Sequence, residues 1–208
     1  MPGRPRGWLL AVEGIDGSGK STLAKSLAAA LKGSDISTSL VFEPTRNLFG
    51  RLARQAATRS PVEAALLFTL DRLSVRKKLD ALLATNTVVI TDRSFYSTMA
   101  YQGSMLSREL RKQLLAVEME VAIVPDLVLW LDGPLEVAMR RLKFRKGGPD
   151  AIERRKTLKR VAEEYRRLAR MERKRFVELD FTVSPAELTE KALSSIEKLW
   201  NRRLPRVA

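Results

Sequence analysis

The sequence predicts an α/β protein in which helices cover both faces of a parallel sheet. Three apolar runs are short enough to be strands, and they lack the alternation of polar and apolar residues expected of a half-exposed strand. They are Trp8 to Val12, Thr87 to Thr91 and Leu127 to Leu131. Helix-like segments lie between them, and strands that alternate with helices are typical of a parallel sheet.

The first run leads into a glycine-rich loop. Residues 14–21 read G-I-D-G-S-G-K-S, the spacing of a phosphate-binding loop, and a helix-like segment from Leu23 to Lys32 follows. The glycines let backbone N–H groups surround a polyphosphate, and the helix start adds a positive dipole end. We expect Lys20 to reach the β- and γ-phosphates and Ser21 to hold Mg²⁺. The predicted nucleotide site is Gly14, Ile15, Asp16, Gly17, Ser18, Gly19, Lys20, Ser21 and Thr22.

The next elements are shorter. Gly33 is expected to end the first helix, and β-branched residues predict a strand over Ile36 to Phe42. A loop over Glu43 to Asn47 follows, because Pro44 ends the strand, and then a short helix over Leu48 to Ala57.

A longer helix carries a clear start signal. Ser60 is a typical N-cap, Pro61 suits the first helical position, and Glu63 completes a capping box. The helix is expected to run to about Ala84. Its predicted core-facing stripe is Leu66, Leu67, Leu70, Leu73, Leu79 and Leu82.

The second half repeats the alternation. Phe144 to Asp150 breaks the helical pattern and predicts a mobile loop, within a lid of approximately residues 141–156. The other predicted elements are a helix over Phe95 to Gln102, a Ser107-capped helix to Ala122, a helix from Pro134 to Lys143, a basic helix over Ala151 to Arg173, a strand over Arg175 to Thr182 and a helix capped by Ser184.

Length and composition limit the function. The 208 residues fit a single domain, 1–208, with a small lid. Without cysteine, thiol catalysis is excluded, and without histidine the commonest general base is missing. No signal peptide or membrane-spanning run is visible, so we expect a cytoplasmic protein.

The net charge of +14 favours nucleotides or nucleic acids as ligands. The basic residues concentrate between Arg140 and Arg175, where aromatic residues are not interleaved in the manner of a base-stacking platform. We therefore interpret them mainly as a solvated helix face with a phosphate-facing subset, and regard nucleic-acid binding as the less favoured reading.

Four carboxylates follow or end predicted strands, namely Glu13, Glu43, Asp92 and Asp132. Ligands of open parallel sheets bind beyond the carboxyl ends of the strands. We therefore expect these side chains to converge near the phosphate loop.

The motifs together resemble the thymidylate kinase family, within the P-loop nucleoside monophosphate kinases. The resemblance covers roughly residues 9–199. It rests on V-E-G-I-D-G-S-G-K-S-T from Val12, E-P-T from Glu43, L-L-F-T-L-D-R from Leu66, D-R-S-F-Y-S-T-M-A-Y-Q-G from Asp92 and P-D-L-V-L-W-L-D from Pro125. It implies a P-loop NTPase-type sheet with a mobile lid, and transfer of the ATP γ-phosphate to dTMP with Mg²⁺, for dTTP synthesis. It also implies a homodimer.

The resemblance assigns an acceptor site, to which Glu43 also belongs. Phe68 would stack on the pyrimidine, Arg72 would meet the base edge, Thr98 would face the pyrimidine, and Tyr101 would lie against the sugar 2′ position. The open alternative is that Phe68 belongs to the core and Arg72 pairs with a nearby acid.

The resemblance and the chemistry assign the reacting groups together. Asp92 can orient Mg²⁺-bound water or the acceptor phosphate, Arg93 can clamp that phosphate, and Asp16 lies near the sugar 3′-hydroxyl. The metal site is then Ser21 and Asp92, and the catalytic set is Lys20, Asp16, Asp92, Arg93 and Arg145. The alternatives are a structural ion pair of Asp92 and Arg93, and an Asp16 that only caps the loop.

No arginine lies between Gly14 and Lys20, so the chain resembles the family members that supply the catalytic cation from the lid. Arg145 and Lys146 are favoured because they border Gly147 and Gly148, a natural hinge; a solvated face is the alternative. The full set of candidates is Arg140, Arg141, Arg145, Lys146, Arg154 and Arg155.

Two departures from the family pattern leave acceptor selectivity open. Phe42 stands where many members have arginine, and Ser94 replaces a tyrosine or histidine. In place of the arginine missing at Phe42, one of Arg46, Arg51 and Arg54 would bind the acceptor phosphate. The alternatives to a dTMP kinase are a kinase for another pyrimidine monophosphate such as dUMP, or a P-loop nucleic-acid-associated ATPase.

Overall fold

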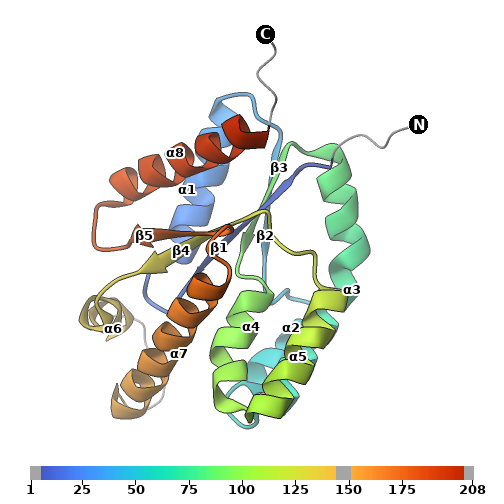
Figure 1. Ribbon diagram of the computed structural model, residues 1–208, viewed down its shortest axis with the longest axis vertical. Coiled ribbons are helices and arrows are strands. Elements are labelled where there is room, and N and C mark those ends of the chain that lie inside the picture. The colour runs from blue at the N-terminus through green and yellow to red at the C-terminus, as the bar shows by residue number, and fades with distance from the viewer. Residues whose placement is uncertain (1–5, 144–150, 204–208) are drawn as a thin grey trace.

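Five parallel strands form one sheet with the order β2-β3-β1-β4-β5 in the computed structural model, which describes residues 6–143 and 151–203 (Figure 1). All four neighbouring pairs are parallel, so the predicted α/β class is confirmed. The strands are β1 (Trp8–Gly14), β2 (Thr38–Phe42), β3 (Val88–Asp92), β4 (Leu127–Asp132) and β5 (Phe176–Asp180).

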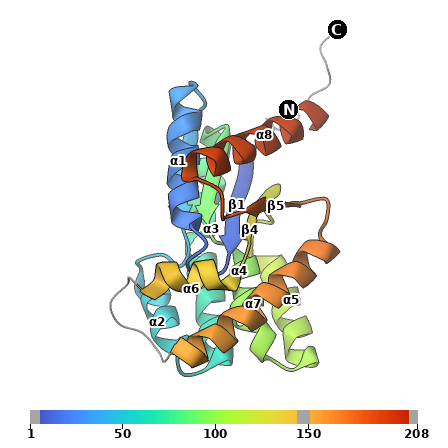
Figure 2. The same cartoon turned by 90° about the vertical axis from the view of Figure 1, so that its left-hand side faces the viewer.

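Helices cover both faces of this sheet. Helices α1 and α8 pack side by side on one face, and α4 and α7 pack together on the other (Figures 1 and 2). The helices are α1 (Lys20–Gly33), α2 (Leu48–Ala56), α3 (Pro61–Thr85), α4 (Phe95–Tyr101), α5 (Arg108–Val121), α6 (Leu135–Lys143), α7 (Ala151–Met171) and α8 (Pro185–Arg203), with a short 3₁₀ turn η1 (Gly103–Met105). None of these helices, within the described ranges, is long and apolar enough to cross a membrane.

The capping signals start helices where the sequence predicts. The hydroxyl oxygens of Ser60, Ser107 and Ser184 each accept a hydrogen bond of 3.2 Å from the backbone N–H three residues later. Each bond satisfies one of the N–H groups that the first helical turn leaves without a partner. The starts of α3, α5 and α8 are therefore determined locally.

Helix α1 ends at Gly33, as predicted, but the left-handed residue that follows is Asp35, with φ of 57°, and not the glycine. Ile36 then donates its backbone N–H to the carbonyl of Leu31 at 3.0 Å, so this N–H is not available for hydrogen bonds between strands. Strand β2 therefore begins at Thr38 rather than at Ile36.

The leucine stripe predicted for α3 is partly wrong. Leu66, Leu70 and Leu73 are 55%, 42% and 52% exposed, whereas Leu67, Leu79 and Leu82 are half-buried. The helix instead buries a mixed face that includes Ala64, Ala65, Thr69, Asp71 and Arg72. Because polar groups of α3 point inward, part of its apolar face is left at the surface.

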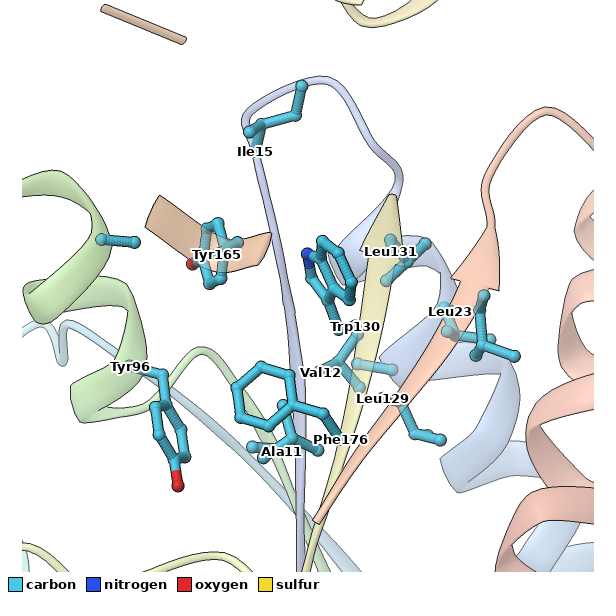
Figure 3. Packing of buried hydrophobic residues seen from close by; sticks show 14 of the residues in the cluster. Ala11, Val12, Ile15, Leu23, Tyr96, Leu129, Trp130, Leu131, Tyr165 and Phe176 are labelled. Carbon is cyan, nitrogen blue, oxygen red and sulfur yellow. The ribbon is translucent and has the colours of Figure 1, made fainter. Parts of the chain in front are cut away.

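The core fixes which strand ends are neighbours. Strands β1, β3 and β4 are almost fully buried, and Figure 3 shows Val12 and Leu129 close together among the packed side chains of β1 and β4. In the register, Val12 lies beside Asp92 and Gly14 lies beside Leu131. The loop after β1 and the turn after β3 therefore leave the sheet side by side.

Close approach of α2 to the loop after β2 depends on Gly50. A Cβ atom there would lie 2.2 Å from the carbonyl oxygen of Thr45, whereas a Cβ on Gly33 would meet no atom within 4 Å. We expect Gly50→Ala to lower the free energy of unfolding by about 1–3 kcal/mol, the usual cost of overpacking. The control Gly33→Ala should be neutral or stabilising by up to about 1 kcal/mol. Denaturant unfolding measures both changes, and equal losses in the two variants would contradict the packing argument.

Candidate active site

Two hollows meet at the carboxyl ends of the strands. The first, of about 370 Å³, is lined by loop and helix residues 16–23 together with Arg141, Phe181, Val183, Pro185 and Leu188. The second, of about 330 Å³, is lined mainly by residues of the β2 loop, α3 and α4. Among the described residues, only Asp16 and Arg93 line both. The site therefore has two compartments joined at one ion pair.

The phosphate loop has a backbone that requires glycine. Gly14, Gly17 and Gly19 have φ values of 144°, 86° and 101°, a region that L side chains rarely adopt. A Cβ on Gly17 would also lie 2.5 Å from the carbonyl of Ala138. Of the predicted nucleotide residues, Asp16 to Thr22 line the first hollow, whereas Gly14 and Ile15 shape the loop behind it.

The ammonium of Lys20 lies inside this loop. It donates to the carbonyl oxygen of Ile15 at 2.8 Å and is 3.8 Å from the carboxylate of Asp16. Burial, and next the charge of Arg93, lower the pKa of Lys20 to about 8. Near this pH, Lys20 is therefore partly neutral in the free protein. Bound anionic phosphates would favour its charged form.

Ser21 and Asp92 form the predicted metal site. The Ser21 hydroxyl donates to Oδ2 of Asp92, while the buried Oδ1 of Asp92 has no hydrogen-bond partner. Hydroxyl and carboxylate oxygens suit Mg²⁺, which usually completes its shell with phosphates and water. No three acidic side chains of the described residues form a metal cage. The pair thus fits a magnesium ion held jointly with phosphate oxygens.

Arg93 connects the two compartments. Its guanidinium donates to Asp16 and, at 3.2 Å, to the hydroxyl of Ser97, and it lies 5.2 Å from the ring centroid of Tyr101. Burial alone would raise the pKa of Asp16, but the charges of Arg93 and Lys20 outweigh it and bring that pKa to about 2. Asp16 is therefore ionised at any physiological pH.

The backbone of Arg93 is unusual for a residue with a side chain, since its φ is 77°. The conformation is held by Arg93 N–H donating to Val12 O at 3.1 Å and by the Thr91 hydroxyl donating to Arg93 O at 2.5 Å. Strained residues of this kind concentrate at functional sites. The turn aims the arginine at the loop that follows β1.

The second hollow contains the predicted acceptor residues. Arg72 donates from Nε and Nη2 to Glu43 at 3.0 and 2.8 Å, from Nη1 to Glu118 at 2.5 Å, and from Nη2 to Thr98 at 3.3 Å. The acid pairing weighed as an alternative is thus present, yet Arg72 lines the hollow with Phe68. These bonds use four of the five guanidinium N–H groups and leave one for a ligand. Burial raises the pKa of Glu43.

Sequence reasoning missed Glu118 and under-rated Arg141. Glu118 is fully buried on α5, four residues after the buried Leu114, so a carboxylate on an apolar helix face was the available signal. Arg141 donates to the loop carbonyl of Ser18 at 3.3 Å and to the carbonyl of Phe181 at 3.0 Å. It is therefore the described lid cation that contacts the phosphate loop.

The other lid candidates do not reach the site or fall outside the structure. Arg155 pairs with Glu136 at 2.6 Å, and neither Arg140 nor Arg154 lines a hollow. Arg145 and Lys146 lie outside the described residues.

Of the four strand-end carboxylates, Glu43 lines the second hollow and Asp92 reaches the phosphate loop through the Ser21 hydroxyl, whereas Glu13 and Asp132 do neither, so the predicted convergence is wrong for these two. Asp132 binds Arg166 of α7 through two hydrogen bonds of 3.0 Å, because β4 ends beneath that helix. Glu13 is fully buried under the site, where it accepts hydrogen bonds from Ser94, the N-cap of α4, and from side chains of α4 and α7. Because Phe42 stands where many family members have arginine, three other arginines were considered for binding the acceptor phosphate. Of these three, only Arg54 lines the second hollow.

Comparison with known proteins agrees with this arrangement. A family model described as Thymidylate kinase matches residues 12–192. A "Probable thymidylate kinase" of Metallosphaera sedula is 36% identical over 191 residues, covering 92% of this chain and 93% of the relative. A "Thymidylate kinase" of Akkermansia muciniphila is 40% identical over 156 residues, covering 73% of this chain and 74% of the relative.

The lowered pKa of Lys20 predicts proton uptake on ligand binding. At pH 8 about half of the Lys20 side chains are neutral in the free protein, so a bound triphosphate should draw in about half a proton. The affinity for ATP should also fall as the pH rises above 8, because the charged form is lost. Calorimetry in two buffers of different ionisation enthalpy measures the uptake. The matched variant Lys20→Arg stays charged and should show none, and equal uptake in both proteins would contradict the assignment.

Proposed function

The chain belongs to the thymidylate kinase family, and we propose that it transfers the γ-phosphate of ATP to dTMP at the junction of its two hollows. Phosphoryl transfer needs two anionic substrates positioned in line, with cations at the transferred group. The observation that carries the proposal is that the two hollows share Asp16 and Arg93. A donor in one hollow and an acceptor in the other would present their phosphates to each other there.

ATP suits the first hollow. Its phosphates would lie against the loop N–H groups and the dipole of α1, with Lys20 beside the β- and γ-phosphates. The far end of the hollow is apolar, formed by Phe181, Val183 and Leu188, with the Arg141 guanidinium 5.5 Å from the Phe181 ring centroid. A flat purine base fits against such an apolar wall, beside the Arg141 guanidinium.

Mg²⁺ would be held by Ser21 and Asp92 together with the phosphates. A bound ion would neutralise negative charge on the ATP phosphates. The residues of this chain contribute the unpartnered Oδ1 of Asp92 and a hydroxyl already directed at the same carboxylate.

dTMP suits the second hollow. Its pyrimidine would lie against Phe68, with the remaining N–H of Arg72 donating to a base carbonyl oxygen. Its phosphate would approach Arg93 at the junction. Ionised Asp16 can only accept hydrogen bonds, so it suits the sugar 3′-hydroxyl rather than the phosphate.

In the reaction, an oxygen of the dTMP phosphate attacks the γ-phosphorus of ATP, and the bond from that phosphorus to the β,γ-bridging oxygen breaks to release ADP. Lys20 and Arg93, which both line the first hollow, would flank the transferred group, and Arg141 contacts the loop that would hold the donor. Arg145 stays a prediction for a further cation from the lid.

The acceptor assignment can be tested against related nucleotides. With ATP and Mg²⁺, we expect dTMP to give the highest kcat/KM in a coupled assay of ADP formation over dTMP, dUMP, dCMP, dAMP and dGMP. The margin over dUMP should be roughly 10- to 200-fold, the effect of one methyl group in an apolar pocket. Arg93→Ala and Lys20→Ala should each lower kcat/KM by at least about 100-fold. Lys77→Ala, on the exposed surface of α3, is the control. Preference for a purine, or full activity without Arg93, would overturn the site.

We also propose that the protein forms a homodimer through α3 and the adjoining α2. The exposed Leu66, Leu70 and Leu73 recur at helical spacing on α3, and Leu48 and Leu52 of α2 are exposed beside it. A cluster of this kind on a surface marks a protein contact.

The dimer proposal predicts a change in mass. Leu66→Glu combined with Leu73→Glu should convert a dimer to a monomer in sedimentation or light-scattering measurements, because buried carboxylates without partners oppose association. Met171→Glu, which alters an exposed apolar residue on α7, should leave the dimer intact. A wild-type protein that is monomeric throughout would exclude this interface.

A further inference from the structure

A buried hydrogen-bond network lies beneath the acceptor compartment and joins β1, α4 and α7. Its centre is the carboxylate of Glu13, which is 0% exposed. Oε1 accepts from the N–H and the hydroxyl of Ser94, both at 2.7 Å, and Oε2 accepts from Ser97 at 2.6 Å and from Tyr165 at 2.8 Å. These four donors fill the usual capacity of a carboxylate.

Ser97 connects the network to Arg93. Its hydroxyl has a single hydrogen, and when that hydrogen is given to Glu13 the oxygen can accept from Nη1 of Arg93 at 3.2 Å. The Tyr165 oxygen lies 2.9 Å from the same Ser97 oxygen. Tyr165 and Glu13 together therefore determine which way the Ser97 hydroxyl points.

The buried side of Arg93 depends on this serine. Of the two acceptors that hold the guanidinium, the Asp16 side chain is 45% exposed, whereas Ser97 is buried. Asp16 belongs to the loop that a nucleotide contacts, whereas the contact with Ser97 lies in the buried wall of the second hollow. A fixed second shell of this kind holds a binding group in its productive geometry.

We propose that the hydroxyl of Tyr165 is a positioning group for the acceptor phosphate, acting through Glu13 and Ser97 on Arg93. The inference rests on the proposed function, in which Arg93 binds that phosphate. Tyr165 lies on α7, far along the chain from the acceptor motifs, and its ring is part of the core (Figure 3). The ring therefore serves packing, and the hydroxyl serves the site.

A second buried tyrosine provides a matched control. Tyr96 lies on α4, and its ring packs edge-on against Phe176. In Figure 3 its hydroxyl points away from Tyr165, whose own hydroxyl points toward α4. Replacing either tyrosine by phenylalanine removes one oxygen and keeps the ring, but only the Tyr165 change reaches Glu13.

The test separates positioning from packing by comparing the two substrates. Tyr165→Phe should raise KM for dTMP roughly 10-fold, as loss of a second-shell partner does, with KM for ATP unchanged within twofold. Tyr96→Phe should leave both constants unchanged. A purely structural role would instead lower the melting temperature and the active fraction without moving KM for dTMP. KM for dTMP within twofold of wild type in Tyr165→Phe, or an equal rise for ATP, would overturn the proposal.

A double-mutant cycle checks the route. Ser97→Ala removes the acceptor facing Arg93, so adding Tyr165→Phe to it should raise KM for dTMP by no more than a further twofold. Independent, multiplicative effects would mean that Tyr165 acts by another path. Failure of the proposed function is visible separately, because it would appear in the wild-type protein as absence of dTMP turnover. In that case the cycle is measured with calorimetric affinities for dTMP, and unchanged affinity in Tyr165→Phe would again overturn the inference.

Discussion

The ion pair between Asp16 and Arg93 is the contact on which both compartments depend. It exists because β1 and β3 are neighbours in a register that places Val12 beside Asp92, so that the phosphate loop and the turn after β3 leave the sheet together. The left-handed backbone of Arg93 then turns its side chain toward the loop. The pKa values of the two groups move apart, downward for Asp16 and upward for Arg93, so the pair stays charged.

The two compartments differ in how their cations are held, apart from this pair. On the loop side, Lys20 donates to the carbonyl of Ile15 and Arg141 to the carbonyl of Ser18, and burial, then the charge of Arg93, lowers the pKa of Lys20. On the acceptor side, Arg72 is paired with Glu43 and Glu118, and Arg54 lines the same hollow. Backbone carbonyls leave the positive charge of the loop side available to a polyphosphate, whereas carboxylates neutralise much of the charge of Arg72.

Features set by local chemistry were predictable from the sequence, and those set by packing between distant segments were not. The glycines of the phosphate loop and the serine caps act within a few residues, and they were located correctly. Asp132 looked equivalent to Asp92 as a strand-end carboxylate, but Arg166 from α7 engages it. The role of Glu118 was missed for the same reason, because it depends on α3 lying against α5.

Helix α3 shows why its leucine stripe was misread. At 100° per residue, Phe68 and Arg72 lie on nearly the same side of the helix, and Leu66, Leu70 and Leu73 cluster on roughly the opposite side. The side with Phe68 and Arg72 faces inward, toward the second hollow and buried polar groups. Because the leucines lie on the opposite side, they face away from the core. A partner subunit covering those leucines would fix the rotation of α3, and with it the positions of Phe68 and Arg72. The proposed association and the proposed acceptor recognition would therefore use two faces of one helix.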